Sequence, residues 1–259
     1  MKQLKAAFRP LAKVSGTTIL VLYALTIGVG YAAWVYAHAQ NPVIPTLPEV
    51  AHAWVTLVNQ GLVNRLIESI TLNLEALALS SVISVGLAYL SVMPLAAPLA
   101  KIVALLRFLG FTGISFVFGL YAEQRTLQVL MLTFGIMTFF TTSMLAVVGS
   151  VPQEDINLSR TLRHGPWETV WNAVVRGQLD QTLVVLEQTA AIGWVMLTMV
   201  EGMVRSEGGI GVMLIDQNRR LQLAAVFALQ ITILITGFVL VKGIAFIRSI
   251  LCPWSTLEA

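Results

Sequence analysis

A chain of 259 residues in which 57% are hydrophobic and only 11% are charged differs strongly from the composition of a water-soluble domain. Its mean hydropathy is +0.81, and its apolar residues come in blocks of roughly 20, the length that a helix needs to cross a bilayer about 30 Å thick. The net charge of +3 arises from basic residues in loops and at chain ends, which excludes a basic face for nucleic acid, and we expect no nucleic-acid partner.

The blocks predict an all-α integral membrane protein with one domain over residues 1–259 and about six transmembrane helices. A basic leader over 1–16 carries Lys2, Lys5, Arg9 and Lys13. No small-residue cleavage site stands out after it, so we expect the first block to remain as an anchor. Membrane spans are predicted at 17–37, 70–90, 102–120, 126–148, 181–200 and 223–247, with a tail over 248–259.

The distribution of Lys and Arg predicts the orientation. With the N-terminus inside, 11 of the 16 basic residues lie on the cytoplasmic side. The positive-inside rule then places both termini in the cytoplasm. The adjacent Asp216 is expected to neutralise part of the Arg219–Arg220 charge outside. The basic residues on the outer side are Arg65, Arg125, Arg205, Arg219 and Arg220.

Three prolines between residues 41 and 48 forbid a continuous helix and predict an extended crossing over the outer surface. Residues 49–60 then follow the pattern of a short amphipathic helix, with Val50, Trp54 and Leu57 on one side. Such a helix either lies in the membrane interface or packs on the bundle, and the pattern is compatible with both.

Residues 149–177 form the longest polar stretch on the inner side. Pro152, followed by Glu154 and Asp155, predicts a helix start, because proline and acidic residues suit the first turn. Residues 164–166, His-Gly-Pro, break that helix. A second helix with an apolar stripe is expected after the break, so the stretch predicts a helix–turn–helix across the cytoplasmic face. The stripe comprises Trp167, Val170, Trp171 and Val174.

The segment from Ser159 to Trp167, Ser-Arg-Thr-Leu-Arg-His-Gly-Pro-Trp, resembles the cytoplasmic motif of permease subunits of type I ABC importers, in the nitrate/sulfonate/taurine branch. Further similar elements follow the branch's order over nearly the whole chain. They are Pro45-Thr46-Leu47-Pro48-Glu49-Val50, Ser69 with Leu72, Gly193-Trp194, Glu201-Gly202-Met203, Gly208-Gly209-Ile210-Gly211 and Pro253-Trp254.

The resemblance implies the type I ABC importer permease fold and a coupling helix that docks into a groove of a separate ATPase subunit. Arg160 is expected to meet an acidic part of that groove, with Leu162 and Trp167 as apolar anchors. For the tryptophans, an anchoring role at the lipid headgroups is an equal alternative. The residues assigned to coupling are Ser159, Arg160, Thr161, Leu162, Arg163, His164, Gly165 and Trp167.

The sequence departs from the motif at several positions. Asn157-Leu158-Ser159 stands for acid-Ala-Ala, Arg163 for glycine, and Arg176-Gly177 for Leu-Pro. We expect Gly165, two positions after Arg163, to supply the turn that the missing glycine would make. The chain is therefore identified as a divergent member, such as one half of a heterodimer.

The resemblance also implies the partners and the location. The partners are ABC ATPase subunits, a second permease subunit in a homodimer or heterodimer, a periplasmic or lipid-anchored substrate-binding protein, and membrane lipid. The location is the bacterial inner membrane, with multiple crossings. No cofactor is expected in this chain, because ATP and Mg would be bound by the ATPase, and the solute would be a small compound such as a sulfonate or nitrate anion.

Polar and glycine residues within or beside the spans are candidates for the pathway and its gate. For Glu187 an interhelical hydrogen bond is an equal alternative, and for the threonines helix packing is the favoured reading. The glycines allow a backbone fold-back after the fifth span, which in the family helps to form the outer gate. The candidates are Glu187, Thr138, Thr142, Trp194, Glu201, Gly208, Gly209 and Gly211.

No catalytic constellation accompanies these features. The chain has no phosphate-binding loop ending in Gly-Lys-Ser/Thr, and His38, His52 and His164 are far apart, so we predict no metal site and no enzyme. Two other functions compete with transport driven by an ATPase. One is a membrane scaffold or regulatory subunit with a permease fold, which the altered motif favours, and the other is a secondary transporter.

Overall fold

The structure is a computed structural model that describes residues 16–40, 43–205 and 208–253. Every regular element in these ranges is helical, and no strand occurs within them, so the prediction of an all-α chain is confirmed. Five of the described helices are long and apolar enough to cross a membrane, or six if one bent helix pair counts as a crossing. Most of the basic leader and Trp254 lie outside the described residues.

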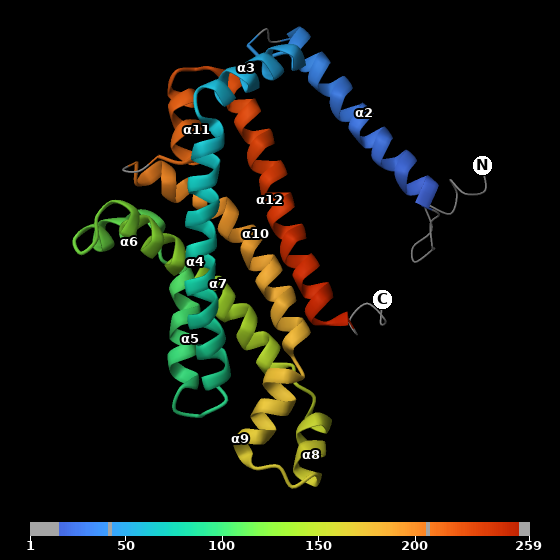
Figure 1. Ribbon diagram of the computed structural model, residues 1–259, viewed down its shortest axis with the longest axis vertical. Coiled ribbons are helices and arrows are strands. Elements are labelled where there is room, and N and C mark those ends of the chain that lie inside the picture. Colours follow the sequence, from blue (N-terminus) through green and yellow to red (C-terminus); the bar gives the residue numbers. More distant parts are fainter. Residues whose placement is uncertain (1–15, 41–42, 206–207, 254–259) are drawn as a thin grey trace.

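Four long helices form the bundle: α4 (Leu62–Leu90), α7 (Gln124–Gly149), α10 (Leu179–Met203) and α12 (Leu223–Leu251). α4 packs mainly on α7, and α10 contacts both α7 and α12 (Figure 1). α4 begins before the predicted span at 70, because the helix continues past the apolar block as far as Gly61, which has a φ of 90°.

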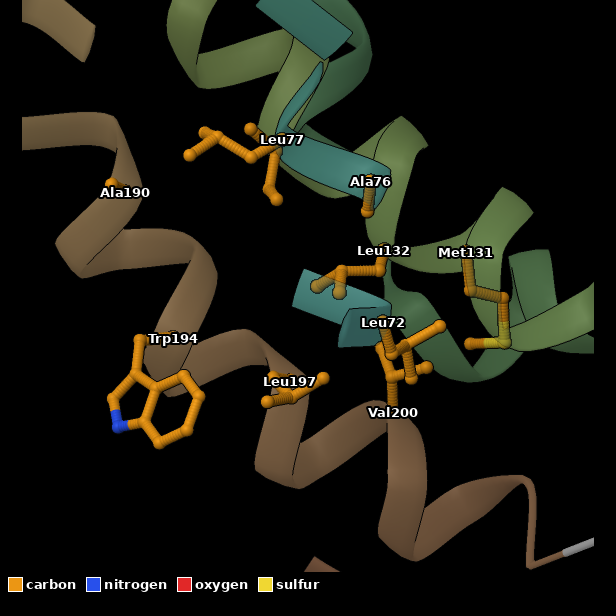
Figure 2. Packing of buried hydrophobic residues seen from close by; sticks show 10 residues of the cluster. Leu72, Ala76, Leu77, Met131, Leu132, Ala190, Trp194, Leu197 and Val200 are labelled. Carbon is orange, nitrogen blue, oxygen red and sulfur yellow. The ribbon is translucent and has the colours of Figure 1, made fainter. Parts of the chain in front are cut away.

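The main core lies where α4, α7 and α10 meet. Leu72 and Ala76 of α4 lie near Leu132 of α7 and Leu197 of α10, whereas the indole of Trp194 in the same cluster points away from α4 (Figure 2). All five side chains are buried. The indole Nε1 of Trp194 also donates a hydrogen bond to the carbonyl of Ile233 in α12, at 2.8 Å. This core joins three spans that are distant in the sequence.

α3 covers one end of the bundle, and α2 projects from it. α3 (Leu47–Asn59) buries Val50 and Leu57 against α11 (Ile210–Arg219) and α12, so the amphipathic helix expected over 49–60 packs on the bundle. α2 (Gly16–Gln40) has no buried residue and extends away from the other helices (Figure 1). It is attached near its end, where the Trp34 ring meets that of Phe227.

The single span expected over 102–120 is not one helix. α5 (Ala97–Leu105) and the short 3-10 turn η1 (Leu106–Phe108) are followed by α6 (Phe111–Gly119) at an angle of 108°. Leu109 and Gly110 have extended backbone conformations, which interrupt the helical hydrogen bonds. The Phe111 ring occupies the space beside Gly135 of α7, and a Cβ on that glycine would lie 2.4 Å from the ring. This packing keeps α6 at its angle to α5.

The opposite end of the molecule from α3 carries a protrusion between α7 and α10. It consists of α8 (Gln153–Thr161), a turn, α9 (Pro166–Thr169) and the π-helical segment η2 (Val170–Arg176), and we call residues 153–176 the hairpin (Figure 1). The guanidinium of Arg248 forms two hydrogen bonds to the carboxylate of Asp180, at 2.7 and 2.9 Å, so α12 is joined to α10 near the base of the hairpin.

Candidate functional site

The first arm of the hairpin starts and ends where the sequence predicts. Pro152 precedes α8, and two acidic residues occupy its first turn. The helix ends in a Schellman motif, in which the amide of His164 donates to the carbonyl of Ser159 at 3.2 Å and the amide of Arg163 donates to that of Arg160 at 3.0 Å. Pro166 then starts α9, and the Gly165 amide donates to the Glu168 carboxylate at 2.8 Å.

The turn of the hairpin has an arginine in a glycine conformation. Arg163 has a φ of 60°, in the left-handed region that a Schellman motif normally gives to glycine. The expectation that Gly165 would supply the turn is wrong, because Gly165 has a φ of −65° and only precedes α9. The chain therefore keeps the turn at the position where the resemblance has glycine, although the side chain there is arginine.

Replacing Arg163 with glycine should stabilise the hairpin by about 1 kcal/mol, because the left-handed region costs a residue with a Cβ that order of free energy. Hydrogen–deuterium exchange should show about fivefold greater protection of the His164 amide, which closes the motif. Arg163→Ala is the matched control and should give no such gain, since alanine has the same backbone preference. Equal protection in the two variants would contradict this reading of the turn.

The hairpin exposes large apolar side chains to its surroundings. The exposed fraction of the side chain is 61% for Leu162, 63% for Trp167 and 60% for Leu158. Trp171 is exposed as well, but the guanidinium of Arg176 lies 5.9 Å from the centre of its ring. Trp167 has no such partner among the described ring contacts. A tip of this kind has the composition of a contact surface.

The other coupling candidates have mixed positions. Arg160, Thr161 and Arg163 are exposed, and the Thr161 hydroxyl donates to the carbonyl of Leu158 in its own helix at 2.6 Å. Ser159 is buried inside the hairpin, and His164 and Gly165 are half-buried in the turn. These last three therefore shape the hairpin and present little surface for a partner.

A second site, which is polar, lies at the α3 end of the bundle and surrounds one buried carboxylate. Glu201, in the last turn of α10, is 1% exposed, and Ser69 of α4 is fully buried beside it. The Ser69 hydroxyl donates to Glu201 Oε1 at 2.6 Å and accepts a hydrogen bond from the Ile210 amide at 2.9 Å. The Gly211 amide donates to Glu201 Oε2 at 2.7 Å. The carboxylate is thus held from two directions by groups far apart in the sequence.

The glycines of this site are required by the short distance between backbone and carboxylate. Gly209 has a φ of 101°, and a Cβ there would lie 2.4 Å from the Glu201 carboxyl group. A Cβ on Gly211 would lie 2.5 Å from the carbonyl oxygen of Thr198. Gly208 has a φ of 93°. The structure thus brings four of the gate candidates, Glu201, Gly208, Gly209 and Gly211, into one cluster.

An open pocket of about 290 Å³ borders this cluster and is lined by Glu68, Arg125, Gln128 and Gly208, among others. Gln128 of α7 is buried and donates through Nε2 to the carbonyl of Val204, just after α10, at 2.7 Å. Arg125 pairs with Glu75 at 2.9 Å. The pocket is therefore large enough for several water molecules, and one of its lining charges, Arg125, is paired.

The ion pair of Asp216 at this end of the bundle differs from the one that the sequence predicts. Asp216 forms its ion pair with Arg205 and not with the adjacent arginines. The side chains of Arg219 and Arg220 are exposed. Neutralisation of that pair by Asp216 is therefore not found.

The remaining gate candidates lie away from the cluster. Thr138 and Thr142 donate hydrogen bonds within α7, to the carbonyls of Gly135 and Thr138, as packing residues do. Trp194 is buried in the core and bonded to α12. Glu187 is half-buried in α10, and no ion pair within 4.0 Å forms at it in the described chain.

Sequence reasoning missed two buried polar residues near Glu201, namely Ser69, which bonds to it, and Gln128, which lines the same pocket. Ser69 was singled out only as part of a similarity, and Gln128 was not singled out at all. A buried glutamine inside an apolar span is a usable signal, since an amide in a membrane helix needs a partner.

A comparison of the chain with protein-family models found no match, and a comparison with curated proteins found none either.

Proposed function

We propose that this chain is the transmembrane permease subunit of an ATP-binding-cassette importer. With a second permease chain it forms the pathway for a small solute, and it is driven by a separate ATPase subunit that binds the hairpin. The observation that carries the proposal is the hairpin itself, a rigidly capped helix–turn–helix that protrudes from the bundle and exposes Leu162 and Trp167 at its tip.

The turn of the hairpin supports this reading over that of a scaffold that has lost coupling. Arg163 has the backbone conformation that glycine has in a Schellman motif, so the change of residue leaves the shape of the docking element intact.

The other features agree with a subunit of a membrane assembly. α2 has no buried residue, as expected for an apolar helix that lipid or a second permease chain covers. Several long apolar helices suit a multi-pass protein of the bacterial inner membrane. The resemblance indicates a small anion as the solute, delivered by a binding protein, and places ATP and Mg on the ATPase.

Transport can be tested by reconstitution of the chain, its second permease chain and candidate ATPase subunits into proteoliposomes without an ion gradient, with the binding protein and labelled nitrate or a sulfonate added outside. We expect solute uptake that requires internal ATP, together with binding of the ATPase to the permease. Uptake that continues without ATP when an ion gradient is imposed would instead identify a secondary transporter. Binding of the ATPase without any change in its turnover would identify a regulatory subunit.

A further inference from the structure

The bend between η1 and α6 leaves backbone groups without hydrogen-bond partners, and we call residues 107–113 the elbow. In the described chain, the carbonyls of Phe108 and Leu109 accept no hydrogen bond, and the amides of Gly110, Phe111 and Thr112 donate none. No side chain caps the start of α6 either. The elbow therefore presents bare acceptors beside bare donors.

The elbow lies at the depth of the membrane. The Phe111 ring packs at Gly135, near the middle of α7 (Gln124–Gly149), which is long and apolar enough to cross a bilayer. Leu109, Gly110 and Thr112 are exposed, and α6 projects to one side of the bundle (Figure 1). Hydrocarbon offers no hydrogen bonds, so bare backbone groups at this depth need a cover of protein or water.

A charged side chain at the elbow adds to this requirement. Arg107 is exposed, and its guanidinium lies 4.9 Å from the centre of the Phe108 ring. It forms no ion pair within 4.0 Å in the part of the chain that the structure describes. Charged residues within membrane spans face protein or water and pair with one another or with backbone carbonyls. Lipid alone is therefore a poor neighbour for this surface.

The same surface carries an apolar hollow and an apolar projection. A pocket of about 370 Å³ lies at the elbow and is lined by Leu106, Gly113 and Phe134, among others. The Phe108 side chain is 74% exposed. Gly110 and Gly113 are exposed, and a Cβ on either would meet nothing within 4 Å. Small residues of this kind let a neighbouring membrane segment approach the backbone closely.

From these features we infer that a second copy of this chain covers the elbow, and that the two elbows meet across a two-fold axis. A two-fold interface uses the same surface on both chains, so that surface must be complementary to itself. The elbow has this property, because it carries acceptors beside donors and an exposed ring beside a hollow. The carbonyls of Phe108 and Leu109 in one copy then accept hydrogen bonds from the elbow amides and Arg107 of the other.

A water-filled pathway is the other surrounding that satisfies bare backbone groups, and the side chains at the elbow disfavour it. The residues that line the elbow pocket are all apolar or glycine. Phe116 and Val117, farther along α6, are 74% and 52% exposed. The inference rests on the proposed function for the need of a second permease chain, and it makes that chain identical to this one.

The test measures association of the full chain in lipid vesicles by energy transfer. Cys252→Ser removes the native thiol, and Asn218→Cys provides an exposed labelling position on α11, away from the elbow. Donor- and acceptor-labelled copies should show transfer that falls as the chain is diluted with lipid. Absence of transfer at every dilution would overturn the inference, because the chain would then be a monomer.

Gly113→Leu should raise the dissociation constant of the dimer at least about tenfold, because it blocks close approach of the two backbones. Gly243→Leu in α12 is the matched control and should change nothing, since Gly243 is also exposed and also has no neighbour within 4 Å. Phe108→Ala removes the projecting ring independently and should weaken association by about tenfold. A dimer that neither elbow variant weakens would form through another surface and would contradict the inference.

Leu109→Cys in the Cys252→Ser chain distinguishes the three possible covers. Leu109 is 53% exposed near the expected axis, so mild oxidation should join two copies through a disulfide. Leu234→Cys, at a 72% exposed position of α12, should give at least about tenfold fewer linked dimers. Rapid reaction of the Leu109→Cys thiol with a membrane-impermeant maleimide would show a water-filled surrounding. A thiol that neither links nor reacts would show lipid, and either result would overturn the inference.

These measurements need no ATPase, so their failure can be told apart from failure of the proposed function. A chain that stays monomeric in vesicles, yet supports ATP-driven uptake together with a different permease chain, refutes the elbow interface and leaves the proposed function standing. Dimers that depend on Gly113 and Phe108, without binding of any ATPase, support the interface and refute the proposed function.

Discussion

Leu162→Asp should weaken the binding of the ATPase subunit at least about 30-fold, because a central apolar anchor of an interface contributes about 2 kcal/mol or more. The side chain is 61% exposed, so the substitution removes little packing within the chain. It places a charge at the tip of the hairpin, where we expect an apolar part of the partner to close over it. Binding can be measured by titrating the ATPase onto the permease in nanodiscs.

Val55→Asp is the matched control for that experiment. Val55 is 62% exposed and lies on α3, at the opposite end of the bundle from the hairpin. The substitution should leave ATPase binding unchanged. Equal affinity for the Leu162→Asp variant and the unmodified chain would remove the hairpin tip from the interface and contradict the proposed docking surface.

Gly209→Ala should destabilise the chain by about 2–4 kcal/mol, the combined cost of a glycine-only backbone conformation and of overpacking. The backbone there has a φ of 101° and a ψ of 170°, and the new Cβ would lie 2.4 Å from the Glu201 carboxyl group. Because each kcal/mol lowers Tm by about 2–4 °C in a chain of this size, thermal unfolding in detergent can measure the loss.

Substitutions at two other glycines allow the cost of the backbone conformation to be measured separately from the cost of overpacking. Gly61 also has a positive φ, of 90°, but a Cβ there meets nothing within 4 Å, so Gly61→Ala should cost only about 1 kcal/mol. Gly86 lies within α4 with no neighbour and no positive φ, so Gly86→Ala should cost nothing. If Gly209→Ala were no more destabilising than Gly61→Ala, the close contact with Glu201 would be disproved.

Apolar composition was enough to predict the spans of α7, α10 and α12, because the length of an apolar block decides where a membrane helix can lie. The bend between η1 and α6 was not predictable in the same way. Residues 102–120 are almost all apolar, and the bend depends on Phe111 fitting beside Gly135, a contact between two helices that only the folded chain shows.

The two sites differ in how much the sequence reveals. The hairpin could be predicted because local residues mark where its two helices begin, Pro152 before α8 and Gly165 before α9. The cluster at the α3 end could not, since Ser69 and Glu201 are 132 positions apart and nothing in their spacing pairs them. The conformation of Arg163 was also hidden, because sequence preferences assign a positive φ to glycine first.

We propose that the hairpin lies in the cytoplasm, where an ATPase subunit can bind it. Trp167→Cys in a Cys252→Ser chain places one thiol at the exposed tip, and a membrane-impermeant maleimide can then be applied to intact cells and to inverted membrane vesicles. We expect labelling in the inverted vesicles and none in the intact cells. Labelling of the thiol from outside intact cells would contradict it.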